Sequence, residues 1–247
     1  MGSGPAVILV TGAMMTRSMF NELAGMLAAD FTVFNYDRRG RGESNDTKPF
    51  ELAREIEDLE ALIDEAGSSV CVYGISSGAC LAIEAASVLG DKITKLALYE
   101  APYDDRDGAA EGWREYRAEL DRCVAADRNG DAVVLFMKLV GAQDKAVADM
   151  KASPMWPAME TVAPTLPYDA AAMGDDRSVP VSRAAKIKAH ALIMDGAMSK
   201  VYMPFMRESA DKLAKAIPNA KRRTLEGQSH DVSTQVIAPV LAEFFSA

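Results

Sequence analysis

Ser76 has the surroundings most typical of a reactive nucleophile in this chain. It lies in the pattern Gly-x-Ser-x-Gly, with Gly74 and Gly78 two residues away on either side. The run 70–75 before it is apolar and rich in β-branched residues, and the run after it consists of small residues that suit a helix. The pattern predicts a tight strand-to-helix turn in which the glycines leave room around the serine. An ordinary strand–helix turn gives the same pattern by chance, so the rest of the chain must decide.

A base for Ser76 would come from one of only two histidines. His190 falls inside an apolar run and is expected in the core. His230 lies in a polar segment between a predicted strand and a predicted helix, where functional side chains are common. We therefore expect His230 to accept the serine proton.

Several carboxylates could orient that histidine. Glu100 and Asp195 each stand at the end of a predicted strand, and Asp104 and Asp231 are weaker candidates. The carboxyl ends of parallel strands form the active-site edge of an open sheet. Local spacing does not determine which of these carboxylates touches the imidazole.

The segments that carry these residues alternate between strand and helix patterns. Strand-like runs occupy 6–11, 31–36, 70–75, 93–99, 189–195 and 221–225. Helical spacing of apolar residues occupies 17–30, 51–66, 77–89, 202–216 and 232–245. This alternation predicts an α/β fold with a doubly wound, mostly parallel sheet flanked by helices.

Residues 101–186 break the alternation. Helical segments at 113–126 and 131–140 are separated from later ones by proline-broken stretches, and the region contains no convincing strand. We expect an inserted helical cap at 101–186 and a core formed by residues 1–100 and 187–247. Repeats and low-complexity segments are absent from the sequence.

Methionines and a tryptophan are candidates for a substrate pocket. The chain has 14 methionines, whose flexible thioethers suit irregular apolar cavities. We expect Met14, Met155 and Trp156 to line such a pocket. Simple packing of the cap on the core explains Met155 and Trp156 equally well.

The composition favours a small-molecule substrate. The 247 residues are 49% hydrophobic and 26% charged, and the net charge of −9 would repel nucleic acid and anionic membranes. Cys71, Cys80 and Cys123 lack metal or disulfide spacing, which favours reduced thiols. Because the chain shows no signal-peptide pattern and no apolar run of transmembrane length, we expect a cytoplasmic location. We expect no metal and no other cofactor.

Four motifs in this order resemble those of the α/β-hydrolase family. Beside the Gly-x-Ser-x-Gly turn, they are Thr11-Gly12-Ala13, Asp37-x-Arg39-Gly40-x-Gly42-x-Ser44 and Gly227-x-x-His230. The resemblance spans nearly all of the chain outside the predicted cap. It implies a catalytic triad with Ser76 as nucleophile and His230 as base, and an oxyanion hole made by the backbone N–H groups of Ala13 and Ser77. The arginines of the second motif are expected to be structural.

The acid departs from the usual pattern of the family. Most members carry it three residues after the glycine that follows the strand at 189–195, where this chain has Ser199. Some members, haloalkane dehalogenases among them, take it from the end of the preceding strand, which corresponds to Glu100. Glu100 is therefore our first choice and Asp195 the alternative.

The start of the chain also departs from the family. Members usually begin with a β-hairpin, whereas only Met1 to Pro5 precede the strand at 6–11, so the first hairpin is expected to be missing. The strand at 31–36 would then be an exposed sheet edge, which predicts edge pairing, a homodimer or reduced stability.

The resemblance implies a serine hydrolase acting on a small or medium carboxylic ester, lactone or thioester. A carbon-carbon bond hydrolase or a cofactor-free perhydrolase would use the same triad. A catalytically weak ligand-binding protein of the same fold is a further alternative, because Ser199 stands where most members have the acid. Ser76 argues against dehalogenases and epoxide hydrolases, which use an aspartate nucleophile.

Overall fold

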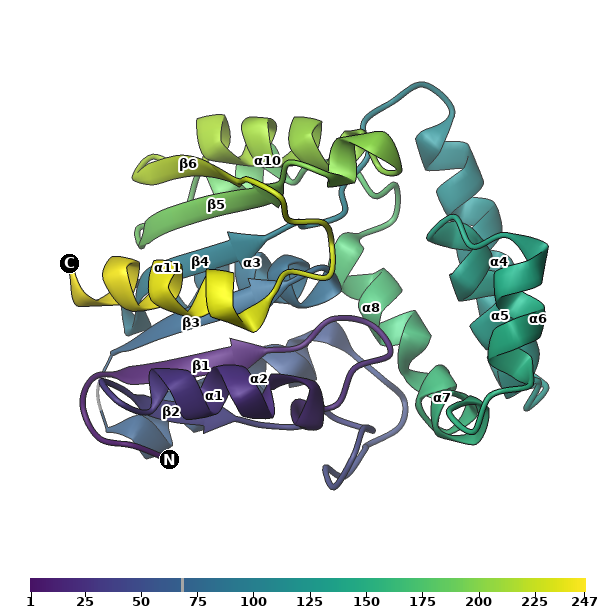
Figure 1. Cartoon of the computed structure of the whole chain (residues 1–247), viewed down its shortest axis with the longest axis horizontal. Helices are drawn as coiled ribbons and strands as arrows, with labels where there is room; N and C mark the ends of the chain where they lie inside the picture. Colours follow the sequence, from purple (N-terminus) through teal and green to yellow (C-terminus); the bar gives the residue numbers. More distant parts are fainter. Residues whose placement is uncertain (68) are drawn as a thin grey trace.

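A computed structural model describes residues 1–67 and 69–247. Six parallel strands form one sheet in the order β2-β1-β3-β4-β5-β6 (Figure 1). Their bounds are β1 Ala6–Val10, β2 Thr32–Asn35, β3 Val70–Ile75, β4 Ile93–Tyr99, β5 His190–Gly196 and β6 Ala220–Leu225. The predicted fold class is confirmed, and in the described residues no strand precedes β1.

Helices cover both faces of the sheet. One face packs against α1 (Asn21–Leu27) and α11 (Thr234–Ser246), and the other packs against α2 (Leu52–Ala66), α3 (Ser77–Leu89) and α10 (Phe205–Ala216). Val7 and Leu9 of β1 belong to the first of these apolar clusters. Ile8 and Val10 belong to the second. The strand is therefore buried on both sides, which explains its continuous apolar run.

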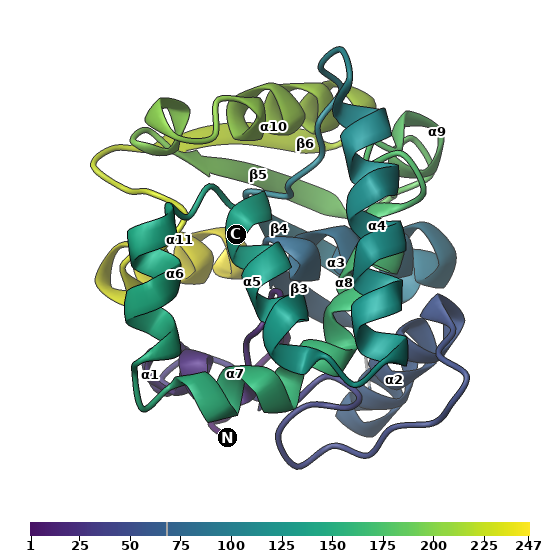
Figure 2. The same cartoon turned by 90° about the vertical axis from the view of Figure 1, so that its right-hand side faces the viewer.

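In the described residues between β4 and β5, the regular elements are all helices, joined by loops. They are α4 (Ala109–Ala125), α5 (Asn129–Leu139), α6 (Asp144–Lys151), α7 (Trp156–Val162), α8 (Leu166–Met173) and α9 (Val181–Ala184). Short 3₁₀ turns occur at Arg17–Phe20, Gly90–Lys92, Ala163–Thr165 and Ser199–Val201. Helices α4 to α7 form a layer set apart from the sheet, beyond the carboxyl ends of its strands (Figures 1 and 2).

The inserted helices share a core with the sheet. Helices α8 and α9 return to the body of the molecule and contact α3. Trp113 of α4 and Leu81 of α3 belong to one continuous hydrophobic cluster. The cap boundaries at 101 and 186 remain a prediction.

The edge strand β2 is partly covered. The Val33 N–H donates to the carbonyl of Met1 at 2.8 Å, and the Met1 amino group donates to the Val33 carbonyl at 3.0 Å. The expectation of a free edge is therefore wrong at Val33, because the first residue of the chain lies alongside it. Dimerisation through this edge remains a prediction, which sedimentation velocity would test.

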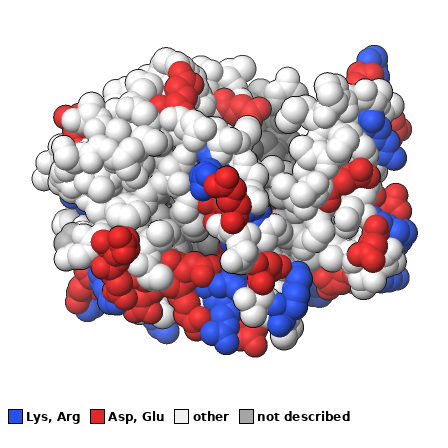
Figure 3. Space-filling view, turned by 90° about the horizontal axis from the view of Figure 1, so that it is seen from below, with Lys and Arg blue, Asp and Glu red and all other residues white. Residues whose placement is uncertain are grey.

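Other expectations from the sequence have mixed outcomes. The three cysteines are buried and free, as predicted. His190 was expected in the core, but it is exposed, because it is the first residue of β5 and precedes the buried part of the strand. None of the described helices has the length and apolar character needed to cross a bilayer. On the face seen in Figure 3, basic side chains are interspersed among acidic ones and form no continuous basic surface.

Candidate active site

Ser76 occupies a strained turn between β3 and α3. Its φ of 56° and ψ of −130° lie outside the regions that side chains favour. The Ser76 N–H donates to the Tyr99 carbonyl at 2.9 Å, which ties this turn to β4. A Cβ added to Gly74 would lie 2.6 Å from the Gly78 carbonyl oxygen. A Cβ added to Gly78 would lie 2.4 Å from the Val10 carbonyl oxygen. Both positions therefore require glycine.

Gly78→Ala is expected to lower the free energy of unfolding by about 1 to 3 kcal/mol, because the added methyl group would meet the backbone of the neighbouring strand β1. Gly112 of α4 is the matched control, because no atom lies within 4 Å of a Cβ added there. Gly112→Ala is expected to raise the free energy of unfolding by roughly 0.5 to 1 kcal/mol through higher helix propensity. Urea denaturation measures both, and similar effects of the two substitutions would contradict the packing argument.

His230 is paired with Glu100. Its Nδ1 lies 2.7 Å from Glu100 Oε2, and the Glu100 side chain is fully buried. The second carboxylate oxygen of Glu100 accepts the N–H of Gly196 at 2.7 Å. With Nδ1 engaged by the carboxylate, the other ring nitrogen, Nε2, is left for chemistry in the cavity. The structure thus brings together the two residues that the sequence placed 130 positions apart.

In the described structure Asp195, the alternative acid, does not contact His230. The prediction that Asp195 could be the partner of this histidine is therefore wrong. Asp195 Oδ1 lies 2.8 Å from Arg222 Nη2 and accepts the Thr224 hydroxyl at 2.7 Å. Its Oδ2 lies 3.4 Å from Arg207 Nε. The side chain faces the arginines of β6 and α10, whereas Glu100 lies beyond the last residue of β4 and reaches the histidine loop.

The loop that carries His230 is held by residues that sequence analysis did not select. The Tyr99 hydroxyl donates to the carbonyl of Ser229, the residue before His230. A Cβ added to Gly196 would lie 2.5 Å from the Gln228 carbonyl oxygen, so this loop packs directly on the end of β5. The motif Gly-x-x-His gave no indication of these contacts, because they join the histidine loop to the ends of β4 and β5.

Ser76 and His230 line one cavity of about 750 Å³. Its walls are mostly apolar and come from the loop after β1, from α1, from α5 and from the start of α10; they include Met15, Phe20, Leu23, Phe136, Leu139, Phe205 and Met206. The serine and the histidine are not hydrogen-bonded to each other in the described structure, and such contacts often tighten only when substrate binds. In residues 1–67 and 69–247, no group of three His, Cys, Asp or Glu side chains is placed to hold a metal ion.

The predicted pocket residues do not line this cavity. Met14 packs against the cluster on the opposite side of the sheet from α1. Met155 is 60% exposed, and Trp156 packs beside Gly130 of α5. These three predictions are wrong. Met155 and Trp156 lie at the start of α7, which is away from the serine. In the loop after β1, Met15 and not Met14 lines the cavity.

The predicted oxyanion donors lie on the same cavity. Ala13 and Ser77 both line it, and neither backbone N–H donates to an acceptor in the described part of the chain. A Cβ added to Gly12 would lie 3.0 Å from Ser76 Cβ, so the loop after β1 runs directly against the serine turn. The two N–H groups are therefore free to bind a ligand oxygen at this turn.

A buried ionic cluster holds that loop. Arg41 Nη1 donates to the Gly12 carbonyl at 2.7 Å, and Arg38 Nη1 donates to the Thr11 carbonyl at 3.2 Å. Asp169 of α8 accepts from Arg38, from Arg41 and from the Ser77 hydroxyl, each at 2.7 Å. The arginines are structural, as predicted from the sequence, and Asp169 ties the inserted helices to the serine turn.

Asp169→Ala is expected to lower the free energy of unfolding by about 3 to 5 kcal/mol at neutral pH, because it leaves Arg41 buried without a carboxylate. Burial alone would raise the pKa of Asp169, but Arg41 and Arg38 hold it below its ordinary value. Because the pKa of Asp169 is lower in the folded than in the unfolded protein, its carboxylate stabilises the fold at pH values above the unfolded pKa of about 3.9. This contribution to stability is lost as the pH falls through the folded pKa.

Urea denaturation of the wild type and of Asp169→Ala, at neutral and at acidic pH, tests this expectation. The difference in unfolding free energy between the two proteins should shrink in acid. A difference that is absent at neutral pH, or that grows as the pH falls, would contradict the role given to Asp169.

The sequence of residues 7–241 matches the model of the alpha/beta hydrolase family. An alpha/beta hydrolase from Sphaerobacter thermophilus is 49% identical, with a TM-score of 0.86 over 99% of this chain and 93% of that one. The enol-lactonase from Burkholderia xenovorans is 21% identical, with a TM-score of 0.72 over 100% of this chain and 93% of that one, and it shares the fold. An uncharacterized hydrolase of Bacillus subtilis, YraK, is 36% identical over 93 residues, which are 34% of this chain and 32% of that protein. The match thus spans about a third of the length of this curated relative.

Proposed function

The chain belongs to the alpha/beta hydrolase family, and we propose that it hydrolyses a small or medium carboxylic ester, lactone or thioester through an acyl-enzyme on Ser76. One observation carries this proposal. The buried carboxylate of Glu100 lies 2.7 Å from His230 Nδ1, and His230 and Ser76 line the same cavity. A serine, a histidine and an acid in this relation are the parts that nucleophilic acyl transfer requires.

Acylation begins when His230 Nε2 takes the proton of the Ser76 hydroxyl. The serine oxygen then bonds to the substrate carbonyl carbon, and the carbonyl oxygen becomes negatively charged. The leaving alcohol, thiol or ring oxygen receives the proton from His230 as its bond to carbon breaks. Glu100 accepts a hydrogen bond from the Nδ1–H group of the imidazole, without taking that proton, and stabilises the positive charge of the ring while Nε2 holds the serine proton.

The backbone N–H groups of Ala13 and Ser77 stabilise the oxyanion. Each such donor typically contributes about 2.7 to 4 kcal/mol to the lowering of the barrier. Because the donors are backbone groups, their position depends on the loop after β1 and on the first turn of α3. The Asp169 cluster connects those two segments.

Deacylation repeats these steps with water as the nucleophile. His230 takes a proton from water, the hydroxide oxygen bonds to the acyl carbon, and the bond to Ser76 breaks. The serine oxygen recovers its proton from His230, and the carboxylic acid leaves. The mostly apolar walls of the cavity suit an acyl group of several carbons.

A series of para-nitrophenyl esters of increasing acyl length tests this proposal. We expect release of nitrophenol at a rate that saturates with substrate and that is lost in Ser76→Ala. Saturable binding of these esters without turnover by the wild type would instead favour a ligand-binding protein. Cleavage of a carbon-carbon bond, or formation of a peracid with added hydrogen peroxide, in the absence of ester hydrolysis would favour the other two alternatives.

A further inference from the structure

Arg177 brings an unpaired positive charge to the cavity of Ser76. Among the described residues that line the cavity, it is the only lysine or arginine. Its Nε donates to the Pro102 carbonyl at 2.5 Å, and its guanidinium carbon lies 4.8 Å from the ring centre of Phe205. In the part of the chain that the structure describes, neither Nη atom donates to a protein acceptor.

The carboxylate whose charge acts most strongly on Arg177, that of Asp104, is already engaged. Asp104 forms a bidentate pair with Arg106, with distances of 2.8 Å and 2.7 Å. Burial lowers the pKa of Arg177, and the charge of Asp104 offsets this only in part. The guanidinium is therefore partly shielded from solvent and has no carboxylate of its own, an arrangement that is costly unless a ligand supplies one.

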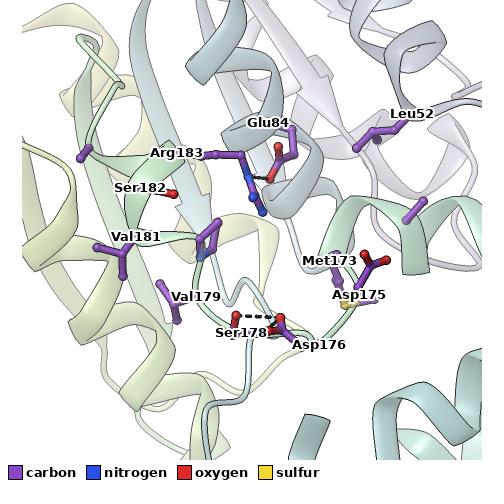
Figure 4. Close-up of a pocket in the computed structure, with 14 residues that line it drawn as sticks. Leu52, Glu84, Met173, Asp175, Asp176, Ser178, Val179, Val181, Ser182 and Arg183 are labelled. Atoms are coloured by element: carbon purple, nitrogen blue, oxygen red, sulfur yellow. Dashed lines mark hydrogen bonds and ion pairs between the residues drawn. The ribbon is translucent and has the colours of Figure 1, made fainter. Parts of the chain in front are cut away.

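The segment 174–180 between α8 and α9 carries Arg177, which lines the same cavity as Ser76. Asp176 Oδ1 accepts the N–H of Ser178 at 2.9 Å and its hydroxyl at 2.7 Å, so the residues on either side of Arg177 are tied together. Figure 4 shows Asp176 and Ser178 joined in this way. Arg177 has a φ of 57°, close to the 56° of Ser76. A positive φ costs an ordinary residue about 1 to 3 kcal/mol, and such strained residues cluster at active sites, ligand-binding positions and switch regions.

Contacts on both sides hold this segment in place. The Trp113 indole N–H donates to the Gly174 carbonyl at 2.8 Å, and Arg117 Nη1 lies 2.7 Å from Asp175 Oδ1. The Asp104 N–H donates to the Arg177 carbonyl at 2.9 Å. The arginine is thus positioned before any ligand arrives, so binding does not have to order it.

A second hollow lies on the outer side of the same segment (Figure 4). Asp175, Asp176 and Ser178 line it, whereas Arg177 does not. Its arginine, Arg183, is paired with Glu84 at 2.7 Å. The outer hollow therefore offers no free cation, and Arg183 serves as a control for Arg177.

We infer that Arg177 binds a free carboxylate of the substrate, so that the preferred substrate is a half-ester of a dicarboxylic acid or a lactone that carries a carboxylate. A guanidinium presents two parallel N–H groups that match the two oxygens of a carboxylate. The net charge of −9 repels anions from the protein as a whole. Attraction of a carboxylate into the cavity therefore requires a local cation such as Arg177. Among the described residues of the lining, Asp231 is the only one with a carboxylate, and its exposure lets solvent screen the charge. This inference rests on the proposed function.

Two esters that differ only in charge test the inference. They are mono-para-nitrophenyl adipate and its methyl ester, measured as kcat/KM after subtraction of spontaneous hydrolysis. We expect kcat/KM of the wild type to be about 10- to 100-fold higher for the anionic ester. This is the ratio that corresponds to the free energy of a hydrogen bond to a charged group. Arg177→Met should reduce this ratio to about one, and Arg177→Lys should keep part of it. Arg183→Gln, whose amide can still donate to Glu84, should keep the full ratio.

Binding of adipate itself separates failure of the inference from failure of the proposed function. If neither ester is hydrolysed, calorimetric titration with adipate decides. Weaker binding in Arg177→Met than in the wild type then supports the inference, while the hydrolase proposal fails. Hydrolysis with equal ratios in the wild type and Arg177→Met overturns the inference and leaves the hydrolase proposal standing. Equal adipate binding by both proteins, or none by the wild type, also overturns the inference.

Discussion

Ser76→Ala and His230→Ala are each expected to reduce kcat for ester hydrolysis by roughly 10⁴- to 10⁶-fold. The first substitution removes the atom that bonds to the acyl carbon. The second removes the group that accepts the serine proton and returns it to the leaving group. Because the two residues act in the same step, the double variant should be little worse than either single one. Single-turnover and steady-state assays with one para-nitrophenyl ester measure all three.

The chain offers matched controls for both substitutions. His190, the only other histidine, is exposed at the opposite end of β5 from the cavity. Ser87 lies near the end of α3, where its hydroxyl donates to the Glu84 carbonyl at 2.8 Å. His190→Ala and Ser87→Ala should keep the wild-type kcat. A Ser76→Ala protein that stays folded and retains most of its activity would exclude Ser76 as the nucleophile.

Glu100→Gln is expected to reduce kcat by about 10⁴-fold, the loss seen when the acid of a serine triad becomes an amide. The amide has no charge to stabilise the imidazolium and can hold His230 in the wrong tautomer. Its shape is nearly unchanged, so the fold should persist. Circular dichroism checks folding while kcat reports the chemistry.

Asp195→Asn is the companion substitution. The Asp195 carboxylate is bound by Arg222 and Thr224 and does not contact the histidine. The variant should lose about 1 to 3 kcal/mol of unfolding free energy and keep its kcat while folded. If instead Asp195→Asn loses activity and Glu100→Gln does not, the assignment of the acid is wrong.

Local sequence pattern was sufficient for the sheet and for the serine turn. Parallel strands that are buried on both faces must be apolar throughout, and the run at 6–11 shows this directly. Gly74 and Gly78 were recognised from the five-residue pattern around Ser76. The structure adds the reason, because a Cβ at Gly74 would collide with the Gly78 carbonyl and a Cβ at Gly78 with the Val10 carbonyl. Glu100 was the first choice only through the resemblance, because spacing along the chain gave it no advantage over Asp195.

Contacts made by the inserted helices could not be predicted in this way. The Ser77 hydroxyl meets Asp169, 92 residues later in the chain, and no local pattern encodes that meeting. Arg177 stands in a polar loop whose composition resembles any surface turn. Met155 and Trp156 have the composition of pocket residues, but the direction of α7 places them elsewhere. These positions depend on how the inserted segment packs on the sheet.

Labelling with a fluorophosphonate probe, followed by mass spectrometry of the digested protein, shows whether Ser76 is an activated nucleophile. The probe reacts with a serine only where an adjacent base and an oxyanion site activate it. We expect one adduct, on the peptide containing Ser76, that is absent in Ser76→Ala and His230→Ala and forms much more slowly in Glu100→Gln. A folded wild-type protein that forms no adduct, or an adduct at another serine, would show that Ser76 is not the activated nucleophile.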